Sequence, residues 1–151
     1  MKIQILPLVT GAQKATGLTV IIDVFRAFSL EAYMYASGAK KVIPVKTVED
    51  ALALKKENPS YILVGERKGI KVDGFDYGNS PSEFVGVDLS GKTLIHTTSA
   101  GVLGLASAVN ASQIVTGALV NAKATAKYIL EQNPEVVSIV PTGWEGKIKT
   151  E

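Results

Sequence analysis

The sequence contains no cysteine, which excludes disulfide bonds, thiolate metal sites and cysteine nucleophiles. It has one histidine, and only two of its 16 basic residues are arginines. No apolar run approaches the roughly 20 residues that a membrane-spanning helix needs, and the apolar stretch after Met1 and Lys2 is too short for a signal peptide. We therefore expect a cytoplasmic protein with no membrane partner.

Charge of one sign is also scarce, because 16 basic and 14 acidic residues leave a net charge of +2. The lysines are dispersed, and no basic stripe with interleaved aromatic residues is present. We therefore expect no nucleic-acid partner. A length of 151 residues, with 46% apolar and 20% charged residues, suits a single globular domain over residues 1–151.

Apolar runs alternate with helical patterns along the chain, and short polar links separate them. Strands are predicted at residues 3–9, 18–23, 41–45, 61–65, 92–97, 112–117 and 136–141. Helices are predicted at residues 30–37, 48–57, 81–84, 100–109 and 122–132, with Ser29, Thr47 and Asn121 as N-caps. Residues 10–17 are predicted to form a polar turn. This alternation predicts an α/β protein with three α/β/α layers and a mostly parallel sheet.

The end of the chain does not fit a complete three-layer fold. About ten residues follow the last predicted strand without a helix that could cover it, although parallel sheets are normally covered on both faces. We therefore expect a C-terminally truncated part of a longer protein, or a homo-oligomer that covers the exposed face.

Two acid–arginine pairs follow apolar runs, Asp23 with Arg26 and Glu66 with Arg67. A planar guanidinium is suited to two-pronged binding of phosphate, sulfonate or carboxylate. A partly desolvated carboxylate at a strand end favours an arginine or a metal as partner. Because ligands bind at the carboxyl ends of parallel strands, the two pairs predict one anion pocket. The alternatives are that Asp23 only caps a turn and that the arginines form structural salt bridges.

The segment from His96 to Gly101 joins a predicted strand to a predicted helix. The hydroxyls of Thr97, Thr98 and Ser99 and the amides near Gly101 could bind an anion, although serine and threonine are also common at an ordinary helix start. His96 is a candidate acid–base catalyst, but a lone histidine at a strand end is more often packed and hydrogen-bonded locally.

The longest loop, residues 67–81, contains further candidates. Asp76, Asn79 and Ser80 could contact a ligand or fix the turn, because long ordered loops in compact domains are often functional. Lys68 is expected to point into solvent. Near the end of the chain, Trp144 could form a wall of the pocket or pack elsewhere.

Several segments together resemble the 2-phosphosulfolactate phosphatase family. They are Val20-Ile21-Ile22-Asp23-Val24-Phe25-Arg26-Ala27, Gly65-Glu66-Arg67, Gly74-Phe75-Asp76-Tyr77-Gly78-Asn79-Ser80-Pro81, Gly91-Lys92-Thr93 and Thr97-Thr98-Ser99-Ala100-Gly101. The resemblance implies an α/β hydrolase, dependent on Mg²⁺, that releases phosphate from 2-phospho-3-sulfolactate and leaves 3-sulfolactate. In methanogens this step belongs to coenzyme M biosynthesis. The family often has Thr-Thr-Asn-Gly-Thr where this chain has Thr98-Ser99-Ala100-Gly101-Val102, so a side-chain amide and a hydroxyl are missing.

The resemblance also implies roles for the residues above. The absence of cysteine, of Asp-x-Asp and of Arg-His-Gly leaves metal-assisted attack by water as the simplest route, with Asp23 as a covalent nucleophile the alternative. Asp23 and Glu66 would then hold Mg²⁺, directly or through water, and Arg26 and Arg67 would neutralise phosphate or sulfonate oxygens. The remaining candidates would bind substrate: Thr97, Thr98, Ser99, Gly101, Asn79 and Ser80.

Two other functions remain open from the sequence. The same site could bind a phosphorylated or sulfonated metabolite without turning it over, as a non-catalytic anion-binding α/β domain. The chain could also be a structural subunit whose open sheet face packs on a partner.

Overall fold

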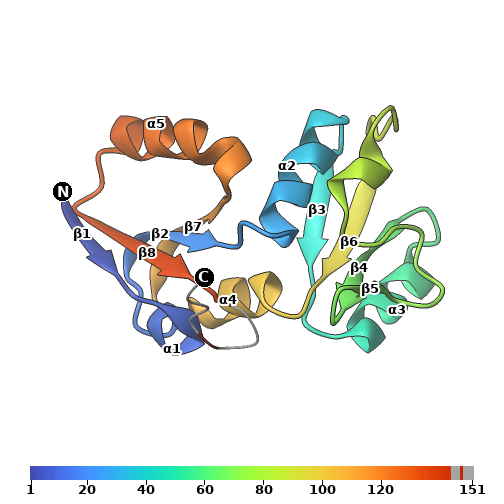
Figure 1. Cartoon of the computed structure of the whole chain (residues 1–151), viewed down its shortest axis with the longest axis horizontal. Helices are drawn as coiled ribbons and strands as arrows, with labels where there is room; N and C mark the ends of the chain where they lie inside the picture. Colours follow the sequence, from blue (N-terminus) through green and yellow to red (C-terminus); the bar gives the residue numbers. More distant parts are fainter. Residues whose placement is uncertain (144–146, 148–151) are drawn as a thin grey trace.

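The computed structural model describes residues 1–143 and 147 of the chain. Its strands divide into two sheets, and each sheet has helices on both faces (Figure 1). Every strand pair is parallel except the pair that includes the short strand β5. The predicted α/β fold with mostly parallel strands is confirmed, and the division into two sheets is a feature that the sequence pattern did not reveal.

The first sheet has the strand order β1-β8-β2-β7, and all its pairs are parallel. Its strands are β1 (Lys2–Ile5), β8 (Val136–Pro141), β2 (Gly17–Ile22) and β7 (Ala111–Gly117). The helices α1 (Leu8–Ala12) and α4 (Gly101–Ser107) cover one face, and α5 (Ala122–Gln132) covers the other (Figure 1). Alternate side chains of β2 point to the two faces of the sheet. Ile21 therefore packs in the core under α1 and α4, and Val20 packs in the core under α5.

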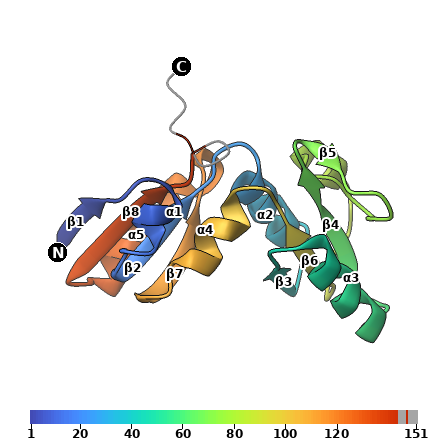
Figure 2. The ribbon, with the colours of Figure 1, turned by 90° about the horizontal axis from the view of Figure 1, so that it is seen from below.

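The second sheet has the strand order β3-β6-β4-β5. Its strands are β3 (Lys41–Pro44), β6 (Thr93–Thr97), β4 (Ile62–Arg67) and β5 (Ile70–Lys71). Helix α2 (Ala27–Ala36) and the 3₁₀ turn η1 (Pro81–Phe84) cover one face, and α3 (Val48–Glu57) covers the other (Figure 2).

Helix α2 links the two sheets. Phe28 packs in the core of the first sheet, whereas Leu30 and Met34 pack in the core of the second. A helix that contacts apolar surface on several sides needs apolar residues around most of its circumference, and six of the ten residues of α2 are buried.

Several predicted elements are confirmed. The structure has α3 at residues 48–57, α5 at residues 122–132 and β8 at residues 136–141. Thr47 caps α3, because its Oγ1 accepts a hydrogen bond of 3.0 Å from the backbone N–H of Asp50. No helix in the described ranges has the length and apolar character that crossing a lipid bilayer requires.

The prediction of one strand at residues 3–9 followed by a turn at 10–17 is wrong. Strand β1 ends at Ile5, and helix α1 begins after Pro7. Proline has no backbone N–H to continue a strand ladder, and its restricted φ suits the start of a helix. The helix then buries Gly11 and Ala12, which a polar turn would expose.

The predicted N-cap Ser29 is wrong, whereas Asn121 has the predicted N-cap position of α5 but makes no side-chain capping bond. Helix α2 begins at Ala27, so Ser29 lies within its first turn and donates to the carbonyl of Val24 at 2.7 Å. Asn121 makes no side-chain bond to α5, and instead accepts from the N–H of Ala118 at 2.7 Å and donates to the carbonyl of Thr116 at 3.1 Å. Both side chains stabilise the turn before the helix, and neither accepts a hydrogen bond from the first N–H groups of the helix.

Candidate active site

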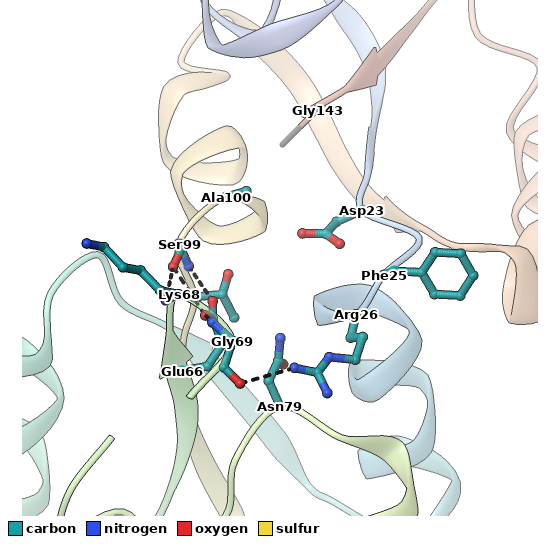
Figure 3. A pocket seen from close by; sticks show the side chains of 11 residues that line it. Asp23, Phe25, Arg26, Glu66, Lys68, Gly69, Asn79, Ser99, Ala100 and Gly143 are labelled. Carbon is teal, nitrogen blue, oxygen red and sulfur yellow. Dashed lines mark hydrogen bonds between the residues drawn. The ribbon is translucent and has the colours of Figure 1, made fainter. Parts of the chain in front are cut away.

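A small pocket of about 70 Å³ lies where the segment after β2 meets the ends of β4 and β6 (Figure 3). The strands belong to different sheets, so the site lies between the two sheets rather than along the edge of one. The pocket is lined by Asp23, Phe25, Arg26, Glu66, Lys68, Gly69, Asn79, Thr98, Ser99, Ala100 and Gly143. The structure therefore brings together most of the residues that the sequence singled out.

Asp23 follows β2 directly, and its carboxylate points into the pocket (Figure 3). Partial burial raises the pKa of this carboxyl above its ordinary value, and the nearby carboxylates of Glu66 and Glu31 raise the pKa further. The backbone N–H of Ala27 and the ring of His96 oppose the shift and lower the pKa. The predicted ion pair between Asp23 and Arg26 does not form: within residues 1–143 and 147 the carboxylate has no ion-pair partner within 4.0 Å.

Gly101 makes room for this carboxylate. A Cβ atom at position 101 would lie 3.0 Å from Oδ2 of Asp23 and 3.1 Å from both Ala27 Cβ and Phe28 Cζ. These separations are shorter than ordinary van der Waals contacts, so a side chain here would displace its neighbours. Gly101 is not among the residues that line the pocket, and its lack of a side chain leaves space for the Asp23 carboxylate. Its role in anion binding stays a prediction.

We predict that Gly101→Ala lowers turnover or anion affinity about tenfold, because small misplacements of a reacting group are costly. The expected change in unfolding free energy is at most about 1–2 kcal/mol, since one methyl group must be accommodated. Phosphate-release kinetics and urea unfolding measure the two effects. Ser107→Ala at the other end of α4 is the matched control, and equal activity of the two variants would contradict the prediction.

Arg26 lies immediately before α2, and its exposed guanidinium extends across the mouth of the pocket. Its Nη2 donates to the carbonyl of Gly69 at 3.4 Å, which is the only hydrogen bond of this side chain among the described residues. Most of its donors therefore face solvent and the pocket. A guanidinium held at one corner with its remaining donors available is suited to an incoming anion.

Glu66 is buried, with 6% of its surface exposed, and its carboxylate accepts hydrogen bonds from two neighbouring residues in the structure. Its Oε1 accepts from the N–H of Ser99 at 2.8 Å, and its Oε2 accepts from the N–H of Gly69 at 2.6 Å and from Ser99 Oγ at 3.3 Å (Figure 3). The carboxylate thus ties the end of β4 to the segment after β6. It lines the pocket, and Oε1, which accepts one hydrogen bond, keeps a lone pair available for a further contact.

Lys68 and Gly69 form the two-residue turn between β4 and β5, and both have positive φ, at 53° and 79°. Such a turn matches the twist of the two strands, and glycine adopts this conformation without strain. The prediction that Lys68 points only into solvent missed its place at the pocket. The sequence does contain an indication of this hairpin, because a glycine stands in the two-residue segment Lys68-Gly69 that separates the paired residues 66–67 and 70–71.

Arg67 does not line the pocket, so the prediction that both arginines share one cavity is wrong. Its guanidinium donates to the carbonyls of Glu66 at 2.7 Å and Lys46 at 3.2 Å, and to Thr97 Oγ1 at 2.8 Å. The reason is geometric: β4 continues through Arg67, and consecutive side chains of a strand point to opposite sides. Arg67 lines an adjoining hollow with Lys46, Lys68, Thr98, Ser99 and Leu103.

The hydroxyls after β6 have different surroundings. Thr97 is buried and accepts from Arg67, so it is outside the pocket. Thr98 and Ser99 line the pocket, but Thr98 Oγ1 also accepts from the N–H of Val102 at 3.3 Å, as in an ordinary helix start. These residues therefore shape the wall of the pocket in addition to any contact with a ligand.

Besides Lys68 and Gly69, the long loop contributes Asn79 to the pocket. Ser80 lies outside it and forms a 2.8 Å hydrogen bond between its Oγ and that of Ser82. Asp76 fixes the loop to the sheet, because its Oδ2 accepts from the N–H of Leu63 at 2.7 Å. His96 is fully buried beneath Asn79 and does not line the pocket. Trp144 lies outside the described residues.

In the part of the chain that the structure describes, no three His, Asp or Glu side chains are placed to hold a metal ion together. Magnesium often binds through one or two carboxylates, water and the phosphate of a substrate. Asp23 fits that smaller requirement, because its carboxylate faces the pocket. The donor chemistry is therefore compatible with Mg²⁺ at Asp23, with Glu66 as a neighbour acting through water.

Comparison with known proteins identifies the family of the chain. The family model described as 2-phosphosulpholactate phosphatase matches residues 5–151. Proteins named as probable 2-phosphosulfolactate phosphatases from Carboxydothermus hydrogenoformans, Caldanaerobacter subterraneus and Bacillus subtilis are 44%, 42% and 39% identical to the chain. The matches cover 87%, 85% and 82% of the chain and 54%, 54% and 55% of the relatives, respectively, so the chain spans about half the length of these curated relatives. The chain therefore belongs to the 2-phosphosulfolactate phosphatase family.

Proposed function

We propose that this chain carries the active site of a phosphatase that hydrolyses 2-phospho-3-sulfolactate to 3-sulfolactate and phosphate with the help of Mg²⁺. One observation carries the proposal: Asp23, Arg26, Glu66 and Asn79, which come from three separate segments of a member of this family, converge on one pocket. A carboxylate beside a guanidinium and an amide suits a phosphate ester with a bound cation.

The residues of the pocket have distinct proposed roles. Arg26 donates to phosphoryl oxygens, whose negative charge its fork of N–H groups matches. Asp23 holds the cation, which when bound supplies neutralisation of phosphate charge and activation of water. Glu66 keeps the turn at Gly69 and the backbone at Ser99 in place, because both donate to its carboxylate.

The adjoining hollow suits the rest of the substrate, which carries a sulfonate and a carboxylate besides the phosphate. Lys46, Arg67 and Lys68 line it, and within the described chain none of these cations has a carboxylate within 4.0 Å. The hollow and the pocket share Lys68, Thr98 and Ser99, so one small molecule can contact both. We assign the sulfonate to this hollow.

The test is a phosphate-release assay on 2-phospho-3-sulfolactate and on a panel of small phosphomonoesters, with Mg²⁺ and with a chelator. It is run on this chain and on a curated relative of greater length. We expect Mg²⁺-dependent release that is fastest with the sulfonated substrate. Stoichiometric binding without release by this chain would favour the alternative, a non-catalytic anion-binding domain. A cytoplasmic location and a homo-oligomeric state stay predictions.

A further inference from the structure

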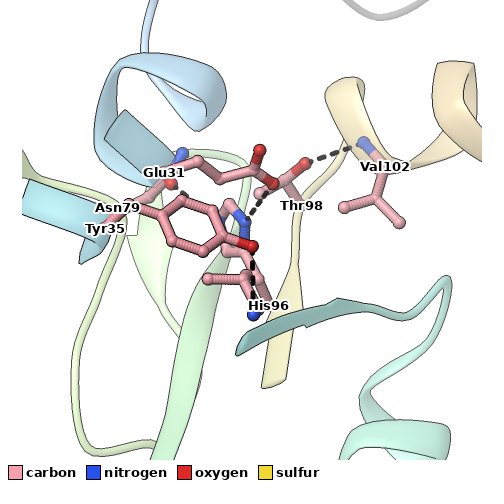
Figure 4. A network of polar contacts seen from close by, with 7 residues as sticks. Glu31, Tyr35, Asn79, His96, Thr98 and Val102 are labelled. Carbon is pink, nitrogen blue, oxygen red and sulfur yellow. Dashed lines mark hydrogen bonds and ion pairs between the residues drawn. The ribbon is translucent and has the colours of Figure 1, made fainter. Parts of the chain in front are cut away.

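A buried network of polar side chains connects helix α2 with Asn79 at the pocket (Figure 4). His96 is fully buried on β6, and its Nδ1 lies 3.2 Å from Oε1 of Glu31. Its Nε2 lies 3.3 Å from Oδ1 of Asn79, the residue that lines the pocket. The roles assigned above to the pocket residues do not use Glu31 or His96.

The contacts of His96 place a proton on one of its ring nitrogens. The Glu31 side chain is 9% exposed, and His96 is its only ion-pair partner within 4.0 Å among the described residues. The Glu31 carboxyl therefore holds the ring at Nδ1 and turns Nε2 toward Asn79. An amide oxygen can only accept a hydrogen bond, so Nε2 carries a proton and donates it to Oδ1 of Asn79.

This arrangement fixes which way the amide of Asn79 points. Its oxygen accepts from His96, so its nitrogen is directed into the pocket, near Arg26 and toward Asp23 (Figure 3). A neutral ring that accepted at Nε2 would require the opposite orientation, with the amide oxygen in the pocket. That oxygen would add negative potential beside Asp23 and Glu66, and it would repel an anionic ligand.

We propose that Glu31 and His96 are positioning residues that hold the Asn79 amide as a hydrogen-bond donor to the anionic group of the ligand. The inference rests on the proposed function, because it assigns the donor to the same pocket. It gives the buried pair a role in affinity that a purely structural ion pair would not have.

The first measurement is the ring protonation of the unaltered chain labelled with ¹⁵N-histidine. Because His96 is the only histidine, every imidazole signal belongs to it. We expect a proton on Nε2 in the unaltered chain, and loss of its fixed hydrogen bond to Asn79 in Glu31→Gln. A ring without a proton on Nε2 in the unaltered chain would overturn the positioning role without touching the proposed phosphatase activity.

The second measurement is the affinity for inorganic phosphate. We expect Asn79→Asp and Glu31→Gln each to weaken binding about tenfold, the size of one charge-assisted hydrogen bond. Glu31→Asp keeps the charge and should retain more affinity than Glu31→Gln, which also decides the matter if Glu31→Gln does not fold. Glu57→Gln at the exposed end of α3 is the matched control and should bind phosphate normally.

The outcomes separate the two proposals. Weak binding by Asn79→Asp with normal binding by a folded Glu31→Gln would leave the pocket intact and overturn the role of the buried pair. Absence of phosphate binding by the unaltered chain would overturn both the positioning role and the proposed function.

Discussion

Arg26→Lys should lower kcat/KM for phosphate release about 100-fold while leaving the fold intact, because a positioned two-pronged donor to transition-state charge is worth roughly 2–4 kcal/mol. The Arg26 side chain is exposed and makes one hydrogen bond of 3.4 Å within the described residues, so its replacement removes little packing. Lysine keeps the charge but loses the planar fork. Steady-state kinetics and urea unfolding report the two quantities.

Arg67→Lys provides the contrast, since the chain has only these two arginines. Its guanidinium makes bonds to two backbone carbonyls and to Thr97, and a lysine cannot reach all three. We expect a loss of about 1–3 kcal/mol in unfolding free energy, the range for hydrogen bonds of a charged group. Lys56→Arg on the exposed side of α3 serves as a control for charge-preserving exchange. If Arg26→Lys stays folded and retains the activity of the unaltered chain, the assignment of Arg26 to the ligand is wrong.

Asp23→Asn should reduce phosphate release at least 1,000-fold, because the carboxylate is the proposed ligand of the cation that neutralises the phosphate charge and activates water. Asparagine has nearly the same shape and keeps the fit against Gly101. Phosphate-release assays at saturating Mg²⁺ measure the effect. Asp73→Asn in the exposed part of the long loop is the matched control and should retain full activity.

The same variant should be more stable than the unaltered chain at neutral pH. Burial raises the pKa of Asp23 in the folded state, so the folded protein binds this proton more tightly than the unfolded chain does. The stability linked to this group is therefore present below the ordinary aspartate pKa and is lost as pH rises through the raised folded value. The gain from asparagine should appear as pH rises through that window and vanish in more acidic solution. Urea unfolding at acidic and neutral pH measures it, and a destabilised Asp23→Asn at neutral pH would contradict the desolvation argument.

The local sequence pattern was sufficient to predict most of the helices and strands. The periodicity and capping signals of residues 48–57 and the apolar runs at 17–22 and 136–141 produced the expected helix and strands. Pattern failed at residues 8–12, where a helix begins after Pro7 and buries Gly11 and Ala12, and at Ser29, which lies within the first turn of α2 and bonds to Val24. The β4–β5 hairpin was missed because its strands extend only a few residues, too short for periodicity to show.

The features of the site likewise divide into those that the sequence predicted and those that only the structure revealed. Asp23, Arg26 and Glu66 could be chosen from sequence because each follows the end of an apolar run, and Asn79 because it lies in the longest loop; the structure places all four at one pocket. The opposite orientations of Glu66 and Arg67 could not be foreseen, because they depend on where β4 ends. The contact between His96 and Glu31, which are 65 residues apart, depends on α2 packing against β6.

The sequence by itself determined the fold class, the absence of thiol chemistry and the short set of polar residues able to bind an anion, because these follow from composition and local periodicity. Only the tertiary structure decided that the strands form two sheets, that the pocket lies between them and that one arginine lines it while the other is bonded to the backbone. The physical reason is that side-chain direction and burial are set by contacts between segments far apart in the chain, and no local pattern contains that information.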